Sequence, residues 1–163
     1  MTLVVVMGAS GSGKSTIGAL LASRRGLPFV DADSLHSPES IAKMAAGEPL
    51  VDEDRWPWLE RVADQLALAR TAGGVVVACS ALKSAYRDAI RRDGDDVLFA
   101  HLAPAPDVLA DRLAARTDHF MPASLLDSQL AALEELAPRE WGIRIDAAVP
   151  PDQIVALIEQ ALG

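Results

Sequence analysis

The chain has 163 residues, half of them hydrophobic, which is enough to bury the core of one domain. Its net charge of −8 argues against nucleic acid as the main partner, because phosphate backbones attract basic surfaces. A single cysteine, Cys79, excludes an internal disulfide framework and a zinc site built from several thiolates, as expected in a reducing cytoplasm. No apolar stretch approaches the roughly 20 residues of a membrane span, so we expect a cytoplasmic protein with no membrane partner.

The first predicted strand, residues 3–7, is entirely apolar and leads into the segment GASGSGKS, residues 8–15. This segment fits the phosphate-binding pattern GxxxxGK[ST] without a mismatch, and residues 14–25 after it are predicted to form a helix that ends at Gly26. Glycines let successive backbone N–H groups turn inward around a phosphate, and the helix N-terminus adds partial positive charge. A chance Gly/Ser-rich turn is the alternative, which the strand–loop–helix context disfavours.

The phosphate-loop pattern also assigns roles to individual residues. Lys14 is expected to reach the β- and γ-phosphates, and the Ser15 hydroxyl to ligate Mg²⁺. The residues predicted to bind a nucleoside triphosphate in this loop are Gly8, Ala9, Ser10, Gly11, Ser12, Gly13, Lys14, Ser15 and Thr16.

The remaining elements alternate along the chain. A short strand is predicted at residues 28–31, and Ser37 followed by Pro38 marks the start of a helix that closes at Gly47. A long helix at residues 55–72 places Pro57 in its first turn, where a missing N–H costs little. Further strands are predicted at 75–79, 97–102 and 143–145, and further helices at 84–92, 106–115, 124–136 and 151–162. Five strands joined by helices predict a three-layer α/β fold with a parallel sheet, in one domain covering residues 1–163.

Several classes of nucleotide-binding protein are excluded by what the sequence lacks. It contains no asparagine, so the NKxD box that reads guanine in GTPases is impossible. It has no LSGGQ-like stretch of a transporter ATPase and no room for the added domains of a motor. A compact kinase, of the group that includes nucleoside monophosphate and shikimate kinases, remains.

Two carboxylates, Asp31 and Asp33, follow the second predicted strand. The carboxyl ends of parallel strands face the ligand crevice, and residues i and i+2 of an extended segment point the same way. One carboxylate can therefore anchor a Mg²⁺-bound water, and the other can accept the proton of an attacking hydroxyl. The alternative is that one of them caps a turn. Beside a phosphate loop we favour function, with Asp31 toward the metal and Asp33 toward the acceptor.

Three longer segments resemble the bacterial gluconokinase family, in order and at matching spacing. They are DADSLHSPESIAKMAAGEPLVDEDRWPWL from Asp31, CSALKSAYRDAIR from Cys79, and RLAARTDHFMPASLLDSQLAALE from Arg112. Ala32 stands where the family usually has glycine, and Ser37 where it usually has proline. The family fold carries a helical substrate-binding segment, here about residues 34–72, and a lid, here about residues 112–126.

The resemblance implies ATP-dependent phosphorylation of D-gluconate on its terminal hydroxyl. Lys14, Asp33 and Arg116 are the implied catalytic residues, and Arg112 is implied to bind the nucleotide with the phosphate loop. A nucleotide-binding regulator without catalysis is disfavoured because these residues are intact, and a shikimate kinase because it would lack the CSALK and GEPL segments. The sequence leaves open whether the protein acts as a monomer or a homodimer.

Gluconate is a flexible polyol with a carboxylate at the end remote from the reacting hydroxyl, so its recognition calls for cations and several hydrogen-bonding side chains. Arg55 is predicted to open a helix, where a cation is unfavourable unless a ligand needs it. Lys83 and Arg87 lie one helical turn apart and would repel unless an anion lies between them. His36 could instead stabilise a turn, and Gln129 could lie on a helix surface. The expected substrate-binding residues are Asp33, His36, Lys43, Arg55, Lys83, Arg87 and Gln129. Trp56, Trp58, His101 and Cys79 are expected to be structural.

Overall fold

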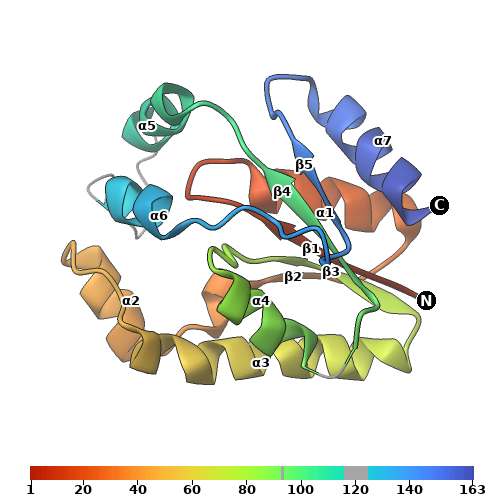
Figure 1. Ribbon diagram of the computed structural model, residues 1–163, viewed down its shortest axis with the longest axis horizontal. Coiled ribbons are helices and arrows are strands. Elements are labelled where there is room, and N and C mark those ends of the chain that lie inside the picture. Colours follow the sequence, from red (N-terminus) through yellow and green to blue (C-terminus); the bar gives the residue numbers. More distant parts are fainter. Residues whose placement is uncertain (93, 116–124) are drawn as a thin grey trace.

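The computed structural model describes residues 1–92, 94–115 and 125–163 (Figure 1). The elements, in chain order, are β1 (Thr2–Met7), α1 (Lys14–Arg25), β2 (Phe29–Asp31), the 3-10 helix η1 (Ala32–Leu35), α2 (Pro38–Ala45), α3 (Asp52–Arg70), β3 (Gly74–Ala78), α4 (Ser84–Arg91), β4 (Val97–Leu102), α5 (Pro106–Ala115), α6 (Leu126–Ala132), β5 (Gly142–Ile145) and α7 (Pro151–Leu162).

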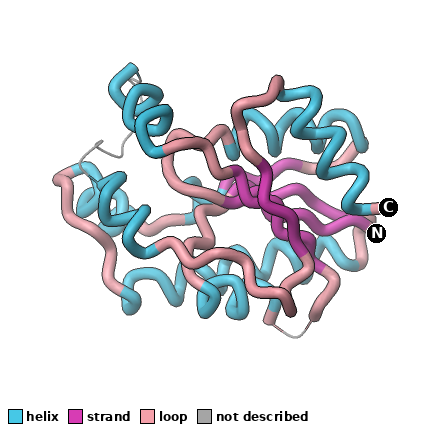
Figure 2. Tube along the Cα trace, turned by 45° about the horizontal axis from the view of Figure 1, so that its top comes forward, coloured by secondary structure: helices cyan, strands magenta, loops and turns pink. Residues whose placement is uncertain are grey.

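Five parallel strands form one sheet in the order β2-β3-β1-β4-β5 (Figure 2). Alternate residues of the central strand β1 face opposite sides of the sheet, as the period of a strand requires. Leu3, Val5 and Met7 pack with α3 and α4, whereas Val4 and Val6 pack with α1 and α7. The central strands β1, β3 and β4 are therefore buried on both faces, which confirms the predicted three-layer α/β architecture.

Two predicted helix ends are confirmed by their local geometry. The Ser37 Oγ accepts a hydrogen bond from the Ser40 N–H at 3.1 Å, with Pro38 as the first residue of α2. Gly26, after α1, has a left-handed φ of 64°. Both signals act within one helical turn, so they could be recognised in the sequence.

The helix α3 begins at Asp52, three residues before its predicted start, and this corrects the position of Pro57, which lies beyond the first turn. The Asp54 Oδ2 accepts a hydrogen bond from the Val51 N–H at 3.1 Å, and three acidic residues occupy the first turn. Acidic side chains are favourable at a helix N-terminus, so they start the helix early. Arg55 is consequently the fourth residue of α3.

The helix α6 is shorter than its predicted span of residues 124–136. It ends at Ala132, because the Glu134 N–H donates to the Leu82 carbonyl at 2.7 Å instead of continuing the helical ladder. The chain after α6 therefore lies against the segment that follows β3.

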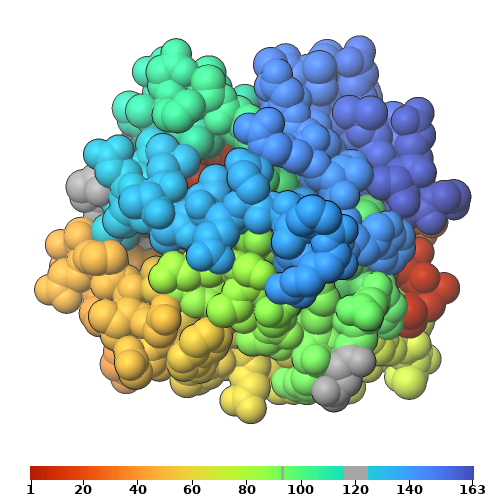
Figure 3. Space-filling view, in the orientation of Figure 1, coloured from red at the N-terminus to blue at the C-terminus, as the bar shows by residue number. Residues whose placement is uncertain are grey.

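The helices α2, α5 and α6 gather beyond the carboxyl ends of the strands, at the left of Figure 1. In the space-filling view, α6 and the segment after it cover much of the face that is turned toward the viewer (Figure 3). Within the described ranges, no helix combines the length and the apolar character that crossing a bilayer would demand.

Candidate active site

The phosphate loop connects β1 to α1, as predicted. Gly8 has a φ of 147°, and a Cβ added to it would lie 2.6 Å from the Leu102 carbonyl oxygen, so no larger residue fits there. Gly11 and Gly13 also have positive φ values, of 82° and 97°. The Lys14 side chain folds over the loop and donates to the Ala9 carbonyl at 3.1 Å. The loop backbone thus turns around the N-terminus of α1, the arrangement that binds a phosphate.

Asp31 and Asp33 play different structural parts. Asp31 ends β2, and its Oδ2 accepts a hydrogen bond from the Ser15 Oγ at 2.8 Å. Its Oδ1 accepts one from the Asp33 N–H at 3.0 Å, so Asp31 also caps the 3-10 turn η1. The extended geometry expected for this pair is wrong, because Asp33 lies inside the turn. Only Asp33 of the two lines the pocket beside the phosphate loop.

Two side chains of α3 hold the turn that carries Asp33. The Trp58 Nε1–H donates to the Ala32 carbonyl at 2.7 Å, and the Arg61 Nε–H donates to the Leu35 carbonyl at 2.7 Å. Trp58 was expected only to pack, and Arg61 was not singled out. The need of a buried indole N–H for an acceptor is the signal in the sequence that could have indicated the first contact.

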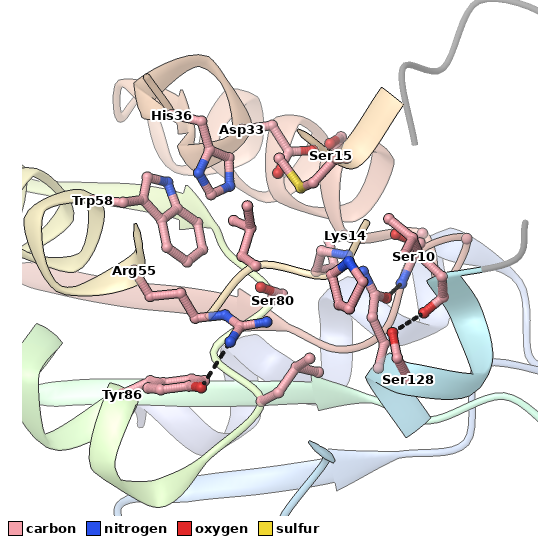
Figure 4. Close-up of a pocket in the computed structure, with 18 residues that line it drawn as sticks. Ser10, Lys14, Ser15, Asp33, His36, Arg55, Trp58, Ser80, Tyr86 and Ser128 are labelled. Carbon is pink, nitrogen blue, oxygen red and sulfur yellow. Dashed lines mark hydrogen bonds between the residues drawn. The ribbon is translucent and has the colours of Figure 1, made fainter. Parts of the chain in front are cut away.

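A pocket open to solvent lies between the phosphate loop and α3 (Figure 4). Among the described residues that line it, three carry a charge: Lys14, Asp33 and Arg55. In Figure 4, Arg55 and Tyr86 lie on one side of the pocket, and Ser10 and Ser128 of α6 on the other. The cavity therefore has a cation on the side away from the phosphate loop.

Arg55 is held by a tyrosine that the sequence reasoning missed. The Arg55 Nη1 donates to the Tyr86 hydroxyl at 3.1 Å, and that hydroxyl donates to the Asp52 Oδ1 at 2.6 Å. Burial and the bond to Asp52 raise the pKa of Tyr86 to about 12, so the hydroxyl stays protonated. The Arg55 side chain is 20% exposed, which leaves it accessible from the pocket. No local sequence pattern joins a helix start to Tyr86, which is 31 residues away.

His36 also lines the pocket, where it stacks on Trp58 with ring centroids 4.1 Å apart. Burial, together with the positive charges of Arg61 and Arg55, lowers the pKa of His36 to about 4. The imidazole is consequently neutral near pH 7. His36 therefore lies both in the pocket lining and at the end of the turn η1, and its contact with substrate stays a prediction.

Three of the expected substrate-binding cations lie outside this pocket lining. Lys43 pairs with Asp54 at 2.7 Å, and Lys83 lies 5.7 Å from the centre of the Tyr86 ring. Arg87 is fully buried and pairs with Glu140. The expectation that Arg87 binds substrate is wrong, because the anion that offsets its charge comes from the chain itself.

On the opposite side of the pocket, the Gln129 Oε1 accepts a hydrogen bond from the Ser10 N–H at 2.7 Å. Gln129 is therefore a pocket residue in contact with the phosphate loop, and not a surface residue of α6. Arg112 of α5 donates to the Gly11 carbonyl at 3.1 Å. Arg116 and most of the expected lid lie outside the described residues.

A second open pocket adjoins the phosphate loop and shares Gly11 and Gly13 with the first. Thr16 and Arg112 line it, together with residues from the segment between β5 and α7. The loop thus lies between two cavities, as transfer between two bound molecules requires.

The residues beside the loop suit Mg²⁺. The Ser15 hydroxyl and the Asp31 carboxylate are hard oxygen donors within 2.8 Å of each other. Magnesium in kinases is held by one or two such protein groups together with the substrate phosphates, so a larger cluster of protein ligands is not needed.

Two of the four residues expected to be structural, His101 and Cys79, are buried, whereas Trp58 lines the first pocket and Trp56 is 42% exposed. His101 of β4 is 1% exposed, and burial lowers its pKa. Cys79 is equally buried, and burial raises the pKa of its thiol to about 12. Neither residue lines the two pockets described above.

Comparison with known proteins identifies relatives over nearly the whole chain. The family model for shikimate kinase matches residues 10–142. A gluconokinase of Gluconobacter oxydans is 46% identical over 153 residues, which cover 93% of this chain and 86% of that protein.

Two solved structures are similar in both sequence and fold. The unliganded crystal structure of a sugar kinase from Janibacter superimposes with a TM-score of 0.93 at 48% identity, covering 99% of this chain and 94% of that one. A gluconokinase from Sinorhizobium meliloti gives 0.88 at 44% identity, covering 99% and 91%. The resemblance found in the sequence is therefore confirmed: the chain belongs to the gluconokinase family, within the shikimate kinase group of P-loop kinases.

Proposed function

We propose that the protein transfers the γ-phosphoryl group of ATP to the terminal hydroxyl of D-gluconate. The observation that carries this proposal is the distribution of charge in the first pocket. Lys14 and Asp33 lie at the phosphate loop, where the reaction would occur, and Arg55 lies across the cavity. Gluconate has the matching polarity, with a hydroxyl to be phosphorylated at one end and a carboxylate at the other.

The geometry of the phosphate loop supports a mode of binding for the nucleotide. The backbone N–H groups of residues 8–16 and the Lys14 ammonium would hold the phosphates, and the nucleoside would occupy the second pocket near Thr16 and Arg112. When bound, Mg²⁺ would neutralise phosphate charge, with Ser15 as its ligand and Asp31 anchoring its water. Phosphoryl transfer depends mainly on such positioning and charge stabilisation.

Asp33 would orient the acceptor hydroxyl and accept its proton. The backbone of the turn η1, which carries this carboxylate, is held by Asp31 at its start and by Trp58 and Arg61 at its carbonyls. Little rearrangement would then be needed during transfer, which favours the reaction. Arg116 is proposed to stabilise the transferring charge from the expected lid.

At the far end, Arg55 would bind the gluconate carboxylate, and His36 and Gln129 would contact its hydroxyls. A neutral imidazole can donate one hydrogen bond and accept another, which suits a polyol.

A coupled assay of ADP release tests the proposal with gluconate, shikimate, glucose and nucleoside monophosphates as acceptors. Gluconate should be used with much the highest kcat/KM. Equal use of glucose or of shikimate would refute the assignment of the acceptor. Product analysis by NMR should place the phosphate on the terminal carbon.

A further inference from the structure

A strained turn after β3, residues 80–82, forms one wall of the first pocket, which the proposed function assigns to the acceptor and which is called the acceptor pocket below. Ala81 has a φ of 46°, in the left-handed region, and is completely buried. Residues other than glycine rarely adopt this conformation, and they keep it only where their surroundings hold them. The neighbours of Ala81 on both sides, Ser80 and Leu82, line the pocket. The conformation of Ala81 therefore determines where this wall lies.

One guanidinium group makes the side-chain contacts that hold the turn, beside the hydrogen bond from the Glu134 N–H to the Leu82 carbonyl. The Nη1 of Arg87, on α4, donates to the Ala81 carbonyl at 2.8 Å and to the Leu82 carbonyl at 3.2 Å. Its Nη2 donates to the Glu135 carbonyl at 3.2 Å. A planar group with five fixed donors can make such contacts at several angles at once, whereas an ammonium on a flexible stem cannot.

Glu140 orients this guanidinium. Its two carboxylate oxygens accept from the Arg87 Nε at 2.8 Å and from the Nη2 at 3.1 Å, and both side chains are fully buried. Burial alone would raise the pKa of Glu140, but hydrogen bonds from Arg87, the Ala137 N–H and Arg91 lower it to about 2. Arg87 and Glu140 thus form a buried ion pair, at a position where either charge alone would be costly.

The same turn is connected to the phosphate loop and to the segment after α6. The Ser80 carbonyl accepts a hydrogen bond from the Gly8 N–H at 3.3 Å, at the start of the loop. The Leu82 carbonyl accepts a hydrogen bond from the Glu134 N–H at 2.7 Å, in the segment after α6. A shift of the turn would therefore displace the wall of the acceptor site relative to the phosphates.

We propose that Arg87, oriented by Glu140, is a positioning residue for the acceptor site. It holds Ala81 in its left-handed conformation and thereby places Ser80 and Leu82 against the bound sugar acid, an inference that rests on the proposed function for the identity of the acceptor. Arg87 touches no reacting group and acts only through the turn.

Arg91 provides a matched control on the same helix. It also hydrogen-bonds Glu140, and it is 7% exposed. Its remaining side-chain contacts, within the described part of the chain, are to Asp88 at 2.8 Å and to the Phe99 ring at 4.7 Å. Arg91 therefore shares the buried anion with Arg87 but does not contact the turn.

The experiment compares Arg87→Lys with Arg91→Lys, measuring kcat, the KM for gluconate, the KM for ATP and the melting temperature. Lysine keeps the charge beside Glu140 in both variants. In R87K, the KM for gluconate should rise about tenfold or more, because small displacements of a binding wall are costly, while the KM for ATP stays within about twofold. R91K should lower the melting temperature without changing either KM.

An unchanged KM for gluconate in R87K, or equal changes in R87K and R91K, would overturn the positioning role. If R87K does not fold, Glu140→Gln serves instead, since it keeps the shape of the side chain and should raise the KM for gluconate in the same selective way. Wild-type protein that releases no ADP with gluconate would refute the proposed function itself, which separates the two failures.

Discussion

Replacing Arg55 with alanine removes the positive charge that lies across the acceptor pocket from the phosphate loop. Among the described residues, its Nη1 contacts the Tyr86 hydroxyl at 3.1 Å and lies 3.6 Å from the Asp52 Oδ1. Its other nitrogens make no hydrogen bond to the described part of the chain, and these are the atoms that a carboxylate would meet. The substitution should therefore weaken gluconate binding without altering the phosphate loop.

The magnitude follows from the hydrogen bonds that the guanidinium would make to the substrate. A hydrogen bond to a charged group contributes about 1.5–3 kcal/mol, and a carboxylate can accept two from one guanidinium. The side chain is 20% exposed, so water screens part of this, and we expect a total near 3 kcal/mol, or a change of about 10²-fold. This should appear mainly in the KM for gluconate, with kcat changed by no more than a few fold, because Arg55 is remote from the transferred group.

Steady-state kinetics with gluconate and with glucose test this prediction. Glucose lacks the carboxylate, so its weak use should hardly change and the preference for gluconate should decrease by about the same 10²-fold. Arg24→Ala serves as the control, because it removes one charge of the ion pair between Arg24 of α1 and Glu159 of α7, which line neither pocket. A gluconate KM within twofold of wild type in the Arg55 variant would refute the role of this residue.

The other predictions concern the loop, the two aspartates and pH. Lys14→Met should reduce kcat at least about 10²-fold with an unchanged circular dichroism spectrum, and retention of more than about a tenth of wild-type turnover would contradict its role. Asp33→Asn should lower kcat far more than it weakens ATP binding, whereas Asp31→Asn should change the Mg²⁺ dependence. Indistinguishable kinetics of the two variants would show that their roles are not separate. The pKa of His36 falls from 6.5 to about 4 on folding, so between these pH values the unfolded chain binds more protons and stability rises with pH. Urea unfolding should show that the free energy of unfolding increases between pH 4 and pH 7 by about 3 kcal/mol less in His36→Gln than in the wild type. Identical pH profiles of the two proteins would refute this prediction.

The sequence itself determined the features that depend on neighbouring residues. The phosphate loop, the cap at Ser37 and the left-handed end at Gly26 are each encoded within a few positions. The central strands β1 and β3 were recognisable because they are almost entirely apolar, as burial on two faces requires. The resemblance in three ordered segments added the family. These signals do not depend on where the rest of the chain lies.

Local signals were less reliable where two of them competed. The sequence predicts that α3 starts near Arg55, which puts Pro57 in its first turn, but the Asp54 side chain caps a helix that begins at Asp52. The sequence predicts that Asp31 and Asp33 lie in an extended strand end, whereas hydrogen bonds from Trp58 and Arg61 stabilise a turn there. A helix that follows later in the chain decided this geometry.

Only the tertiary structure decided which charged side chains face the pocket. Arg55 and Arg87 were both candidates for binding an anion, and nothing local distinguishes them. Arg87 is neutralised by Glu140, which is 53 residues away in the chain, while Arg55 is oriented toward the cavity by Tyr86. Ion pairing depends on distance in space and on burial, because two charges interact strongly only when they are close and shielded from water. Sequence spacing carries neither quantity.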